Sequence, residues 1–304
     1  MRVGASLERF TCIDAQAEQL TGFDQRYEQV QPGDYSGSFL AAESAEVGVF
    51  VERTDRALHQ EGAGPSGAVS AVVLAEAPPT GARANGQDFR AGDVLLVGPG
   101  GSYDAITGAG AAPAVFSLSI DGRTTLPIAP LANRHAGSVR RVADPVISDR
   151  FRQLTRHVVT SWEAAPGSVD VPDAAVQVLM LDLLTAARVG SEARRSSLEL
   201  FRRARADMVA DLTLSRPVNE IAAGLGVSRR TLEHAFDECV DMGPGRFRKL
   251  LRLNHARRLL TEGSSTVTQA AMASGLPHLG RFAADYRTHF GELPSNTGHP
   301  SRIR

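Results

Sequence analysis

Short apolar runs separated by turn residues fill the first half of the chain. Runs of strand length occupy residues 35–40, 47–51 and 69–74, and breaks rich in glycine and proline separate them. Residues 91–103 contain a buried-strand pattern bounded by turn signals, and residues 114–120 form another strand candidate. Many short strands with little helix between them predict a β-sandwich or a small barrel.

Helical spacing of the apolar residues begins after residue 144. Asp144 followed by Pro145 is an N-cap with proline at the first helical position, and the spacing continues to about Trp162. A second, very apolar helix is expected over residues 174–189. Its wide apolar stripe needs a partner, which is either the β-rich region or a second copy of the chain. Residues 190–197 are polar and have the composition of a linker.

The segment PVNEIAAGLGVSRRTLEHAFDECV, which begins at Pro217, predicts a short helix, a tight turn and a second helix. Gly226 suits the left-handed end of the first helix, and Ser228 suits the N-cap of the second. Leu232 and Phe236 face the core of the predicted unit. The opposite face is left with Arg229, Arg230, Glu233 and His234. This is the arrangement of a helix-turn-helix, whose second helix enters the major groove of DNA.

A second copy of this pattern follows in TVTQAAMASGLPHLGRFAADYRTHF, with Gly275 in the turn and Phe282 and Tyr286 as core residues. Ser228 and His278 stand at equivalent positions, 50 residues apart. The long helix RFRKLLRLNHARRLL lies between the units, with inward positions at Phe247, Leu250, Leu251, Leu259 and Leu260. Two recognition helices on one rigid body fit successive major grooves, about 34 Å apart.

The formal charge of the chain is unevenly distributed, although the total is only −1. From residue 194 onward there are 18 lysines and arginines and 11 aspartates and glutamates, whereas residues 1–193 hold 15 and 23. A basic C-terminal part indicates that this part meets a polyanion, and uneven scatter without function is the alternative.

Two other sequence features concern location. No run approaches the roughly 18 apolar residues of a membrane helix, and the N-terminus has no signal-peptide pattern. Cys12 and Cys239 match no metal or redox spacing. We therefore expect a cytoplasmic protein, not associated with a membrane, whose thiols are reduced.

Residues 198–298 resemble the AraC family of bacterial transcription regulators. The resemblance rests on GLGVSRRTLEHAF, MGPGRFRKLLRLNHARRLL and GRFAADYRTHFGELPS. The stretches LRLNHARRLL and HLGRFAADYRTHFGELPSNT look most like the ethanolamine-utilisation-regulator branch. FDQRYEQVQPGDYSGSF and GDVLLVGPGGSYD look like the cupin-like sensor domain often joined to that branch.

The resemblance implies an α+β chain in four parts. Residues 1–140 would form a cupin-like β-sandwich or barrel for sensing or dimerisation, and residues 141–197 a helical connector with a possible dimer interface. Residues 198–298 would form an all-α domain in which a long helix joins two helix-turn-helix units. Residues 299–304 would be a tail.

Carried onto matching positions, the resemblance also implies roles for side chains. The base-reading residues would be Arg230, Glu233 and His234 in the first unit, and His278, Leu279, Arg281 and Ala284 in the second. The phosphate contacts would be Arg229, Lys249, Arg252, Arg257 and Arg258, with solvated charge as the alternative for each. Arginine paired with guanine, or glutamate accepting from cytosine, discriminates between bases by roughly 1–3 kcal/mol.

The second unit departs from the family pattern. Leu276 occupies a position that is usually phenylalanine, and Pro277 replaces a polar or aromatic residue. Leu279 and Ala284 offer only apolar contact, for example to a thymine methyl group. We therefore expect the first unit to carry more of the sequence discrimination, and the second to contribute mainly backbone affinity.

The N-terminal half lacks the residues of a metal-dependent cupin. Such a site needs two nearby histidines, a carboxylate and a later histidine, but this half has only His59 and His135. Tyr103 and Asp104 stand where a metal cupin commonly presents histidine. No metal, cofactor or catalytic activity is expected. The acidic residues of the strands are interpreted as solvated faces: Glu43, Glu46, Glu52 and Asp55.

The leading hypothesis is a β domain that responds to a ligand or dimerises, and so controls the DNA-binding domain. An effector pocket is predicted from side-chain type at Tyr35, Arg53, Tyr103 and Phe116. The expected partners are double-stranded DNA, a second copy of the chain, a small-molecule effector and, for an activator, RNA polymerase. The alternative is a regulator-derived protein, recruited as a small-molecule-binding protein or enzyme, that has lost DNA reading.

Overall fold

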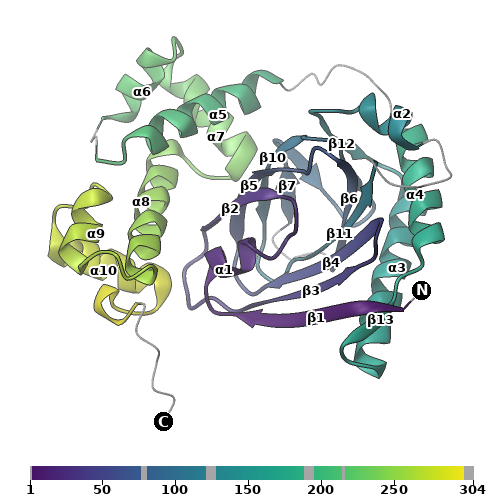
Figure 1. The fold of residues 1–304 in the computed structure, drawn as a ribbon. Helices are drawn as coiled ribbons and strands as arrows, with labels where there is room; N and C mark the ends of the chain where they lie inside the picture. The colour runs from purple at the N-terminus through teal and green to yellow at the C-terminus, as the bar shows by residue number, and fades with distance from the viewer. Residues whose placement is uncertain (1, 77–80, 121–127, 188–194, 214–215, 298–304) are drawn as a thin grey trace. The chain divides into compact units, whose positions relative to one another are not determined.

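The computed structural model describes residues 2–76, 81–120, 128–187, 195–213 and 216–297 (Figure 1). Its internal contacts divide the chain into two units. We call Met1–Tyr27 with Ser36–Ser191 the β unit, and Glu28–Tyr35 with Glu192–Arg304 the helical unit. A β-rich N-terminal region followed by C-terminal helices confirms the predicted order of structure.

Two antiparallel sheets make up most of the β unit. The larger has the strand order β12-β9-β6-β11-β4-β3-β1-β13, and the smaller has the order β2-β5-β10-β7-β8. The strands are β1 (Arg2–Phe10), β2 (Asp24–Gln29), β3 (Gly37–Glu43), β4 (Val47–Thr54), β5 (Leu58–Ala63), β6 (Ala68–Glu76), β7 (Ala82–Ala84), β8 (Gln87–Phe89), β9 (Val94–Val97), β10 (Ser102–Thr107), β11 (Ala112–Ser119), β12 (Val139–Val142) and β13 (Ser168–Asp170). The helices of this unit are α1 (Ile13–Ala17), α2 (Ile128–Asn133), α3 (Pro145–Ala164) and α4 (Asp173–Ala186).

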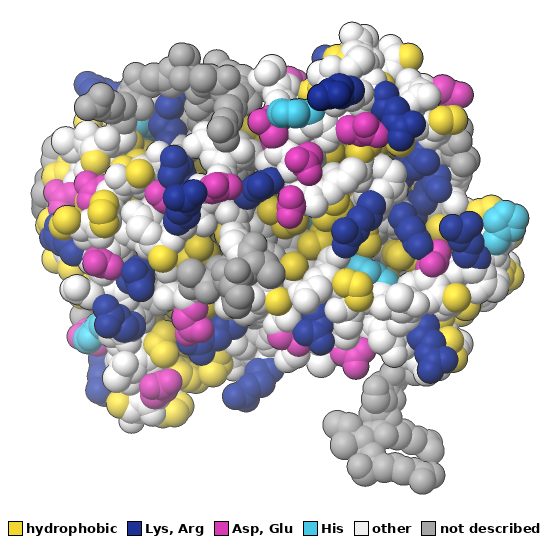
Figure 2. Space-filling model, turned by 180° about the vertical axis from the view of Figure 1, so that it is seen from behind, with side chains coloured by type: hydrophobic (Ala, Val, Ile, Leu, Met, Phe, Trp, Pro, Cys, Tyr) yellow, Lys and Arg dark blue, Asp and Glu magenta, His cyan; other side chains and the backbone are white. Residues whose placement is uncertain are grey.

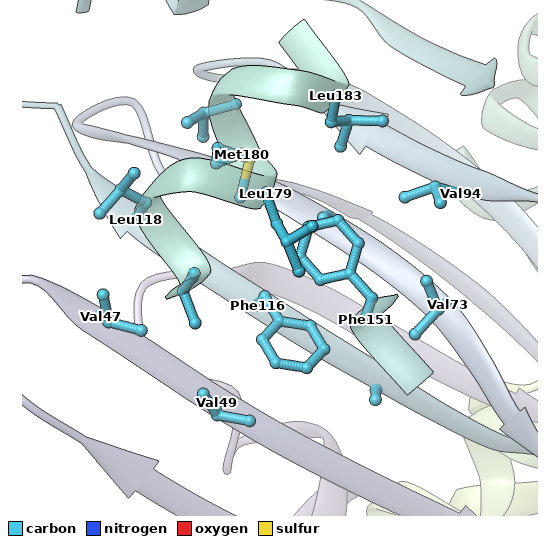
Figure 3. Packing of buried hydrophobic residues seen from close by; sticks show 14 of the residues in the cluster. Val47, Val49, Val73, Val94, Phe116, Leu118, Phe151, Leu179, Met180 and Leu183 are labelled. Atoms are coloured by element: carbon cyan, nitrogen blue, oxygen red, sulfur yellow. The ribbon is translucent and has the colours of Figure 1, made fainter. Parts of the chain in front are cut away.

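One face of the larger sheet packs on α3 and α4 (Figure 3). Because side chains alternate along a strand, Val47 and Val49 of β4 reach this face together with Phe116 of β11. The ring of Phe116 lies 5.0 Å from that of Phe151 on α3, centroid to centroid. The apolar stripe of α4 belongs to the same core, so its partner is the sheet and not a second copy of the chain; its residues are Val176, Leu179, Met180, Leu183 and Leu184.

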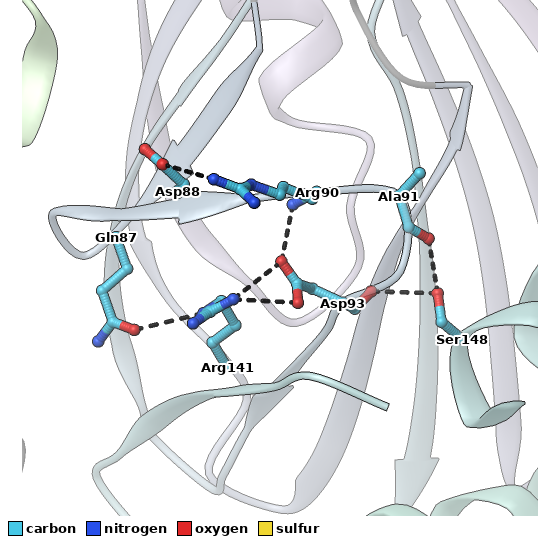
Figure 4. Close-up of polar contacts among 7 residues, drawn as sticks. All are labelled: Gln87, Asp88, Arg90, Ala91, Asp93, Arg141 and Ser148. Atoms are coloured by element: carbon cyan, nitrogen blue, oxygen red, sulfur yellow. Dashed lines mark hydrogen bonds and ion pairs between the residues drawn. The ribbon is translucent and has the colours of Figure 1, made fainter. Parts of the chain in front are cut away.

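The start of α3 is fixed by capping, as the sequence predicts. The Asp144 carboxylate accepts hydrogen bonds from the backbone N–H groups of Val146 and Ile147. A second set of polar contacts ties the helix to the larger sheet (Figure 4). There the buried Asp93 carboxylate accepts from Arg141 of β12 at 3.1 Å, and the Ser148 hydroxyl donates to the backbone oxygen of Ala91 at 2.8 Å.

Glu52 corrects one of our interpretations, because it lies inside the β unit and not on a solvated face. Its carboxylate accepts from the amides of Gln16 and Gln60 at 2.9 and 3.0 Å, and from Tyr27. Burial raises the pKa of Glu52 in spite of these donors. Both faces of β4 are covered, because Val47 and Val49 lie in the core with the helices and Phe50 lies in a second buried cluster. Alternation along this strand therefore did not mark an exposed side.

The helical unit contains α5 (Arg195–Ala210), α6 (Val218–Gly224), α7 (Arg229–Val240), α8 (Pro244–Thr261), α9 (Val267–Ala273), α10 (Leu279–Phe290) and the 3₁₀ turn η1 (Pro294–Asn296). It also contains residues 28–35, which the predicted division placed in the β domain. The backbone of Gln29 exchanges two hydrogen bonds of 3.0 Å with the side chain of Asn254 on α8. The carbonyl oxygen of Gln29 also accepts from His289 Nε2 on α10, at 3.0 Å.

Candidate nucleic-acid interface

The first helix-turn-helix consists of α6, a turn and α7. Gly226 in the turn has a φ of 73°, the left-handed region in which glycine carries no Cβ penalty. The Ser228 hydroxyl caps α7 by accepting from the N–H of Thr231 at 3.1 Å. Both positions confirm the predicted turn and cap. Three aromatic rings anchor α7 to α5 and α8, with centroids 5.0–5.5 Å apart: Phe201, Phe236 and Phe247.

The predicted reading side chains of α7 are on its accessible face. Arg229 and Glu233, one helical turn apart, form an ion pair of 2.7 Å. His234 Nδ1 lies 3.6 Å from the carboxylate of Glu238. Arg230 is exposed, and no described residue provides a polar partner for its guanidinium group. Arg230 is therefore the arginine of this face that has no ion pair with a described residue to break before it could bind a ligand.

The second helix-turn-helix consists of α9, a turn and α10. A reciprocal capping box between Thr266 and Gln269 begins α9, and Gly275 in the turn has a φ of 66°. Phe282, Tyr286 and Phe290 of α10 form the core against α8 and α9. The Tyr286 hydroxyl lies 2.7 Å from that of Thr297, and burial raises the pKa of Tyr286 to about 12.

The exposed surface of α10 is poorer in polar side chains than that of α7. The four positions predicted to read bases are all exposed: His278, Leu279, Arg281 and Ala284. Unlike Ser228, His278 makes no capping hydrogen bond with its side chain. The Arg281 Nε lies 3.8 Å from Asp285 Oδ2. The base contacts, and the unequal share of the two units in sequence discrimination, stay predictions.

Lys249 and Arg252, two of the predicted phosphate contacts, line a groove of about 380 Å³ on the helical unit. Arg248 lines it as well, and the sequence interpretation did not include this residue. Arg252 Nε donates to the backbone oxygen of Leu212 at 2.8 Å, and Arg248 donates to that of Arg216. Figure 2 shows lysine and arginine side chains gathered on the accessible face of this unit.

Burial, followed by the neighbouring arginine charges, lowers the pKa of both Arg248 and Arg252. Crowding of positive charge favours an anion at this place. Spacing is the signal that could have pointed to Arg248: it is four residues before Arg252 and therefore on the same face of α8.

Arg257 and Arg258 are placed differently from the other predicted phosphate contacts. Both side chains are only 14% exposed. Arg257 pairs with Glu292 at 3.3 Å and lies over the ring of Phe290, whereas Arg258 pairs with the buried Glu28 at 3.0 Å. These arginines connect parts of the helical unit, so a phosphate contact by either one, which stays a prediction, would have to replace a carboxylate partner.

The four residues of the predicted effector pocket do not converge. Phe116 is fully buried between the larger sheet and the helices, and Tyr35 belongs to the helical unit. The Tyr103 hydroxyl donates to Gln25 at 2.8 Å, and burial raises the pKa of Tyr103. Arg53 lines a shallow surface groove of about 320 Å³ and pairs with Glu76 at 2.7 Å. Residue type and strand placement in the sequence were therefore not enough to predict residues that share one pocket.

The described residues contain no group of three or more histidine, cysteine, aspartate or glutamate side chains arranged to hold a metal ion. None of their helices combines the length and the apolar composition that a membrane crossing requires.

Comparison with known proteins points to the same unit. Residues 221–299 match a family model described as a helix-turn-helix domain. The HTH-type transcriptional regulator ArgR of Pseudomonas aeruginosa is 33% identical over 87 residues, 29% of this chain and 26% of its own length. The probable thc operon regulatory protein of Rhodococcus erythropolis is 37% identical over 81 residues, 26% of this chain and 24% of its own. A solved AraC-type regulator from Chromobacterium violaceum is 30% identical, with a TM-score of 0.33, and the match covers 36% of this chain and 97% of that one.

Two helix-turn-helix motifs on a shared long helix define a double helix-turn-helix DNA-binding domain. Through this domain the chain belongs to the AraC family of transcription regulators, as its sequence motifs predicted. The chain spans about a quarter of the length of the curated relatives it matches, 26% and 24%. The ethanolamine-utilisation-regulator branch and the cupin-like N-terminal domain stay predictions.

Proposed function

We propose that the whole chain is a sequence-specific regulator of transcription that places α7 and α10 in successive major grooves of double-stranded DNA. The carrying observation is Arg230, exposed at the start of a capped recognition helix and without an internal partner among the described residues. An arginine in this position has the donor geometry to bind the two acceptors of guanine. The protein is proposed to act as a regulator and not as an enzyme.

Regulation is proposed to reach this domain from the β unit. An effector would favour, or disfavour, the form of a homodimer that binds its operator, and an activator would then contact RNA polymerase. These partners, and a cytoplasmic location at the nucleoid, follow from the family and are proposals for this chain. The four predicted pocket residues do not single out one ligand, so the ligand is best sought by its effect on DNA affinity.

The test compares Arg230→Ala with Arg281→Ala on DNA sites carrying single base-pair changes. Loss of an arginine–guanine contact should cost about 10-fold or more on the best site and relax specificity at one position. Arg281→Ala should weaken binding more evenly across sites, because the second unit has fewer polar reading side chains. Equal relaxation of specificity by both variants would refute the proposed division of labour. Folded protein that binds no DNA specifically at low salt, with or without candidate metabolites, would refute the regulator itself.

A further inference from the structure

The groove on the helical unit is lined by the first half of α8, the turn before α10 and the first turns of α10. Five of the side chains that line it are basic or histidine, and one is acidic; they are Arg248, Lys249, Arg252, His278, Arg281 and Asp285. Such a concentration of positive charge in a concave site raises the local concentration of anions.

Asp285 is the acidic side chain of this groove, and it is already engaged with two of the cations. Its Oδ1 lies 2.8 Å from Lys249 Nζ on α8, and its Oδ2 lies 3.8 Å from Arg281 Nε on its own helix. The side chain of Asp285 is 25% exposed, whereas those of Lys249 and Arg281 are 44% and 79% exposed. An incoming anion can therefore reach both cations from the solvent side.

A carboxylate and a phosphodiester present the same kind of acceptor, two oxygens that share one negative charge. Asp285 consequently occupies, inside the protein, the electrostatic position that a DNA phosphate would take. We propose that the groove binds a backbone phosphate of DNA and that Asp285 competes with this phosphate for Lys249 and Arg281. The inference rests on the proposed DNA-binding function, and it adds that Asp285 lowers the affinity of the protein for DNA.

This competition has a definite signature because phosphates carry no sequence information. Displacing Asp285 costs the same free energy on every DNA sequence. The side chain therefore lowers the affinity for specific and non-specific DNA by one factor and leaves their ratio unchanged. A base-reading aspartate would instead change the ratio.

The experiment uses the full chain and a duplex selected from random DNA, beside an unrelated duplex of equal length. Asp285→Asn keeps the shape of the side chain and removes its charge. Glu262→Gln is the matched control, because it makes the same charge change at an exposed position at the other end of α8. Affinity is measured over roughly 50–300 mM salt, where counterion release is resolved.

Asp285→Asn should bind both duplexes about fivefold more tightly, as expected for one released surface ion pair. The slope of log K against log salt should steepen by up to about 1, because the variant has no displaced carboxylate that takes up a cation when DNA binds. Adding Lys249→Gln to Asp285→Asn should remove most of the gain, while Glu262→Gln alone should stay within about twofold of the wild type. Thermal melting checks that each variant is folded.

Several results would overturn the inference. A gain of equal size in Glu262→Gln would show a global charge effect, and weaker binding of only the selected duplex by Asp285→Asn would show base reading. Stabilisation of Asp285→Asn by inorganic phosphate at matched ionic strength, without a gain on DNA, would identify a free-anion site instead. Wild-type protein that binds DNA while Asp285→Asn gains nothing refutes this inference alone; folded wild type that binds no DNA refutes the proposed function as well.

Discussion

The charged side chains of α7 and α10 differ in whether they already have an ion-pair partner within the protein. Arg229 is paired with Glu233 at 2.7 Å, and Arg281 lies 3.8 Å from Asp285. A contact between either arginine and DNA must replace such an interaction, so the net gain is smaller than that of the new contact. Arg230 has no such pair among the described residues, and the full contact energy is available there.

Glu52 is a residue whose protonation couples to stability. Burial raises its pKa above the usual 4.5, so the folded protein binds this proton more tightly than the unfolded chain does. The stability from that proton is complete below about pH 4.5 and is lost as the pH rises through the folded-state value. Glu52→Gln removes the titration, so its unfolding free energy relative to the wild type should increase as the pH rises from 4.5 through the folded-state pKa of Glu52, as measured by urea unfolding.

Glu43→Gln is the control for this prediction, since Glu43 ends β3 at an exposed position. It should leave the pH dependence of the wild type unchanged. If Glu52→Gln kept the same pH profile as the wild type, the raised pKa of Glu52 would be wrong.

Among the structural elements, the turns of the two helix-turn-helix motifs offer a matched comparison. Gly226 and Gly275 both have positive φ, 73° and 66°. A Cβ at Gly226 would meet open space, but a Cβ at Gly275 would collide with the backbone oxygen of Leu212. Gly226→Ala should therefore cost the backbone strain alone, about 1–2 kcal/mol, and Gly275→Ala should cost clearly more, as measured by chemical unfolding.

DNA affinity adds a second readout to this comparison. Because Gly275 lies at the edge of the groove, its substitution should also weaken binding to all duplexes under conditions where the protein is folded. Equal unfolding free energies for the two alanine variants would contradict the close approach of the second turn to Leu212.

Elements with clear periodicity could be predicted from the sequence, and elements governed by pairing could not. The runs at 47–51 and 69–74 fall within β4 and β6, and the run at 114–120 matches β11 except for its last residue, because these strands are apolar over most of their length. β5 was missed because its sequence, LHQEGA, carries polar residues that point into the unit. β1 was missed because most of its side chains are exposed, and its position depends on pairing with β3 and β13. Such pairing is set by distant residues.

In the candidate interface, too, local features were predictable from the sequence and contacts with distant residues were not. Capping and turn residues are local signals, so Ser228, Gly226 and Gly275 were predicted correctly. The ion pair of Arg258 was not predicted, because its partner is Glu28, 230 positions earlier in the chain. Charge on a helix does not by itself show whether it meets solvent, DNA or a carboxylate of the same molecule.

At the scale of the whole molecule, residues 28–35 make the helical unit discontinuous in sequence. Asn254 is 1% exposed and holds the N–H and carbonyl groups of Gln29 at once. Asn254→Ala leaves those groups without their side-chain partner and should lower the free energy of unfolding by roughly 2 kcal/mol. The measurement is chemical denaturation, with the exposed Asn296→Ala as control; an equally small effect of both variants would contradict the role of Asn254.

Because the helical unit is discontinuous in sequence, its segments are synthesised at different times. Residues 28–35 leave the exit tunnel early, but Asn254, Arg258 and His289, to which they bind, are made more than 200 positions later. Until then Glu28 and Gln29 lack these partners, so the DNA-binding unit is completed only after His289 has been made. A chain released early cannot assemble this unit as described, and a fragment cut at the polar linker loses part of its own interior.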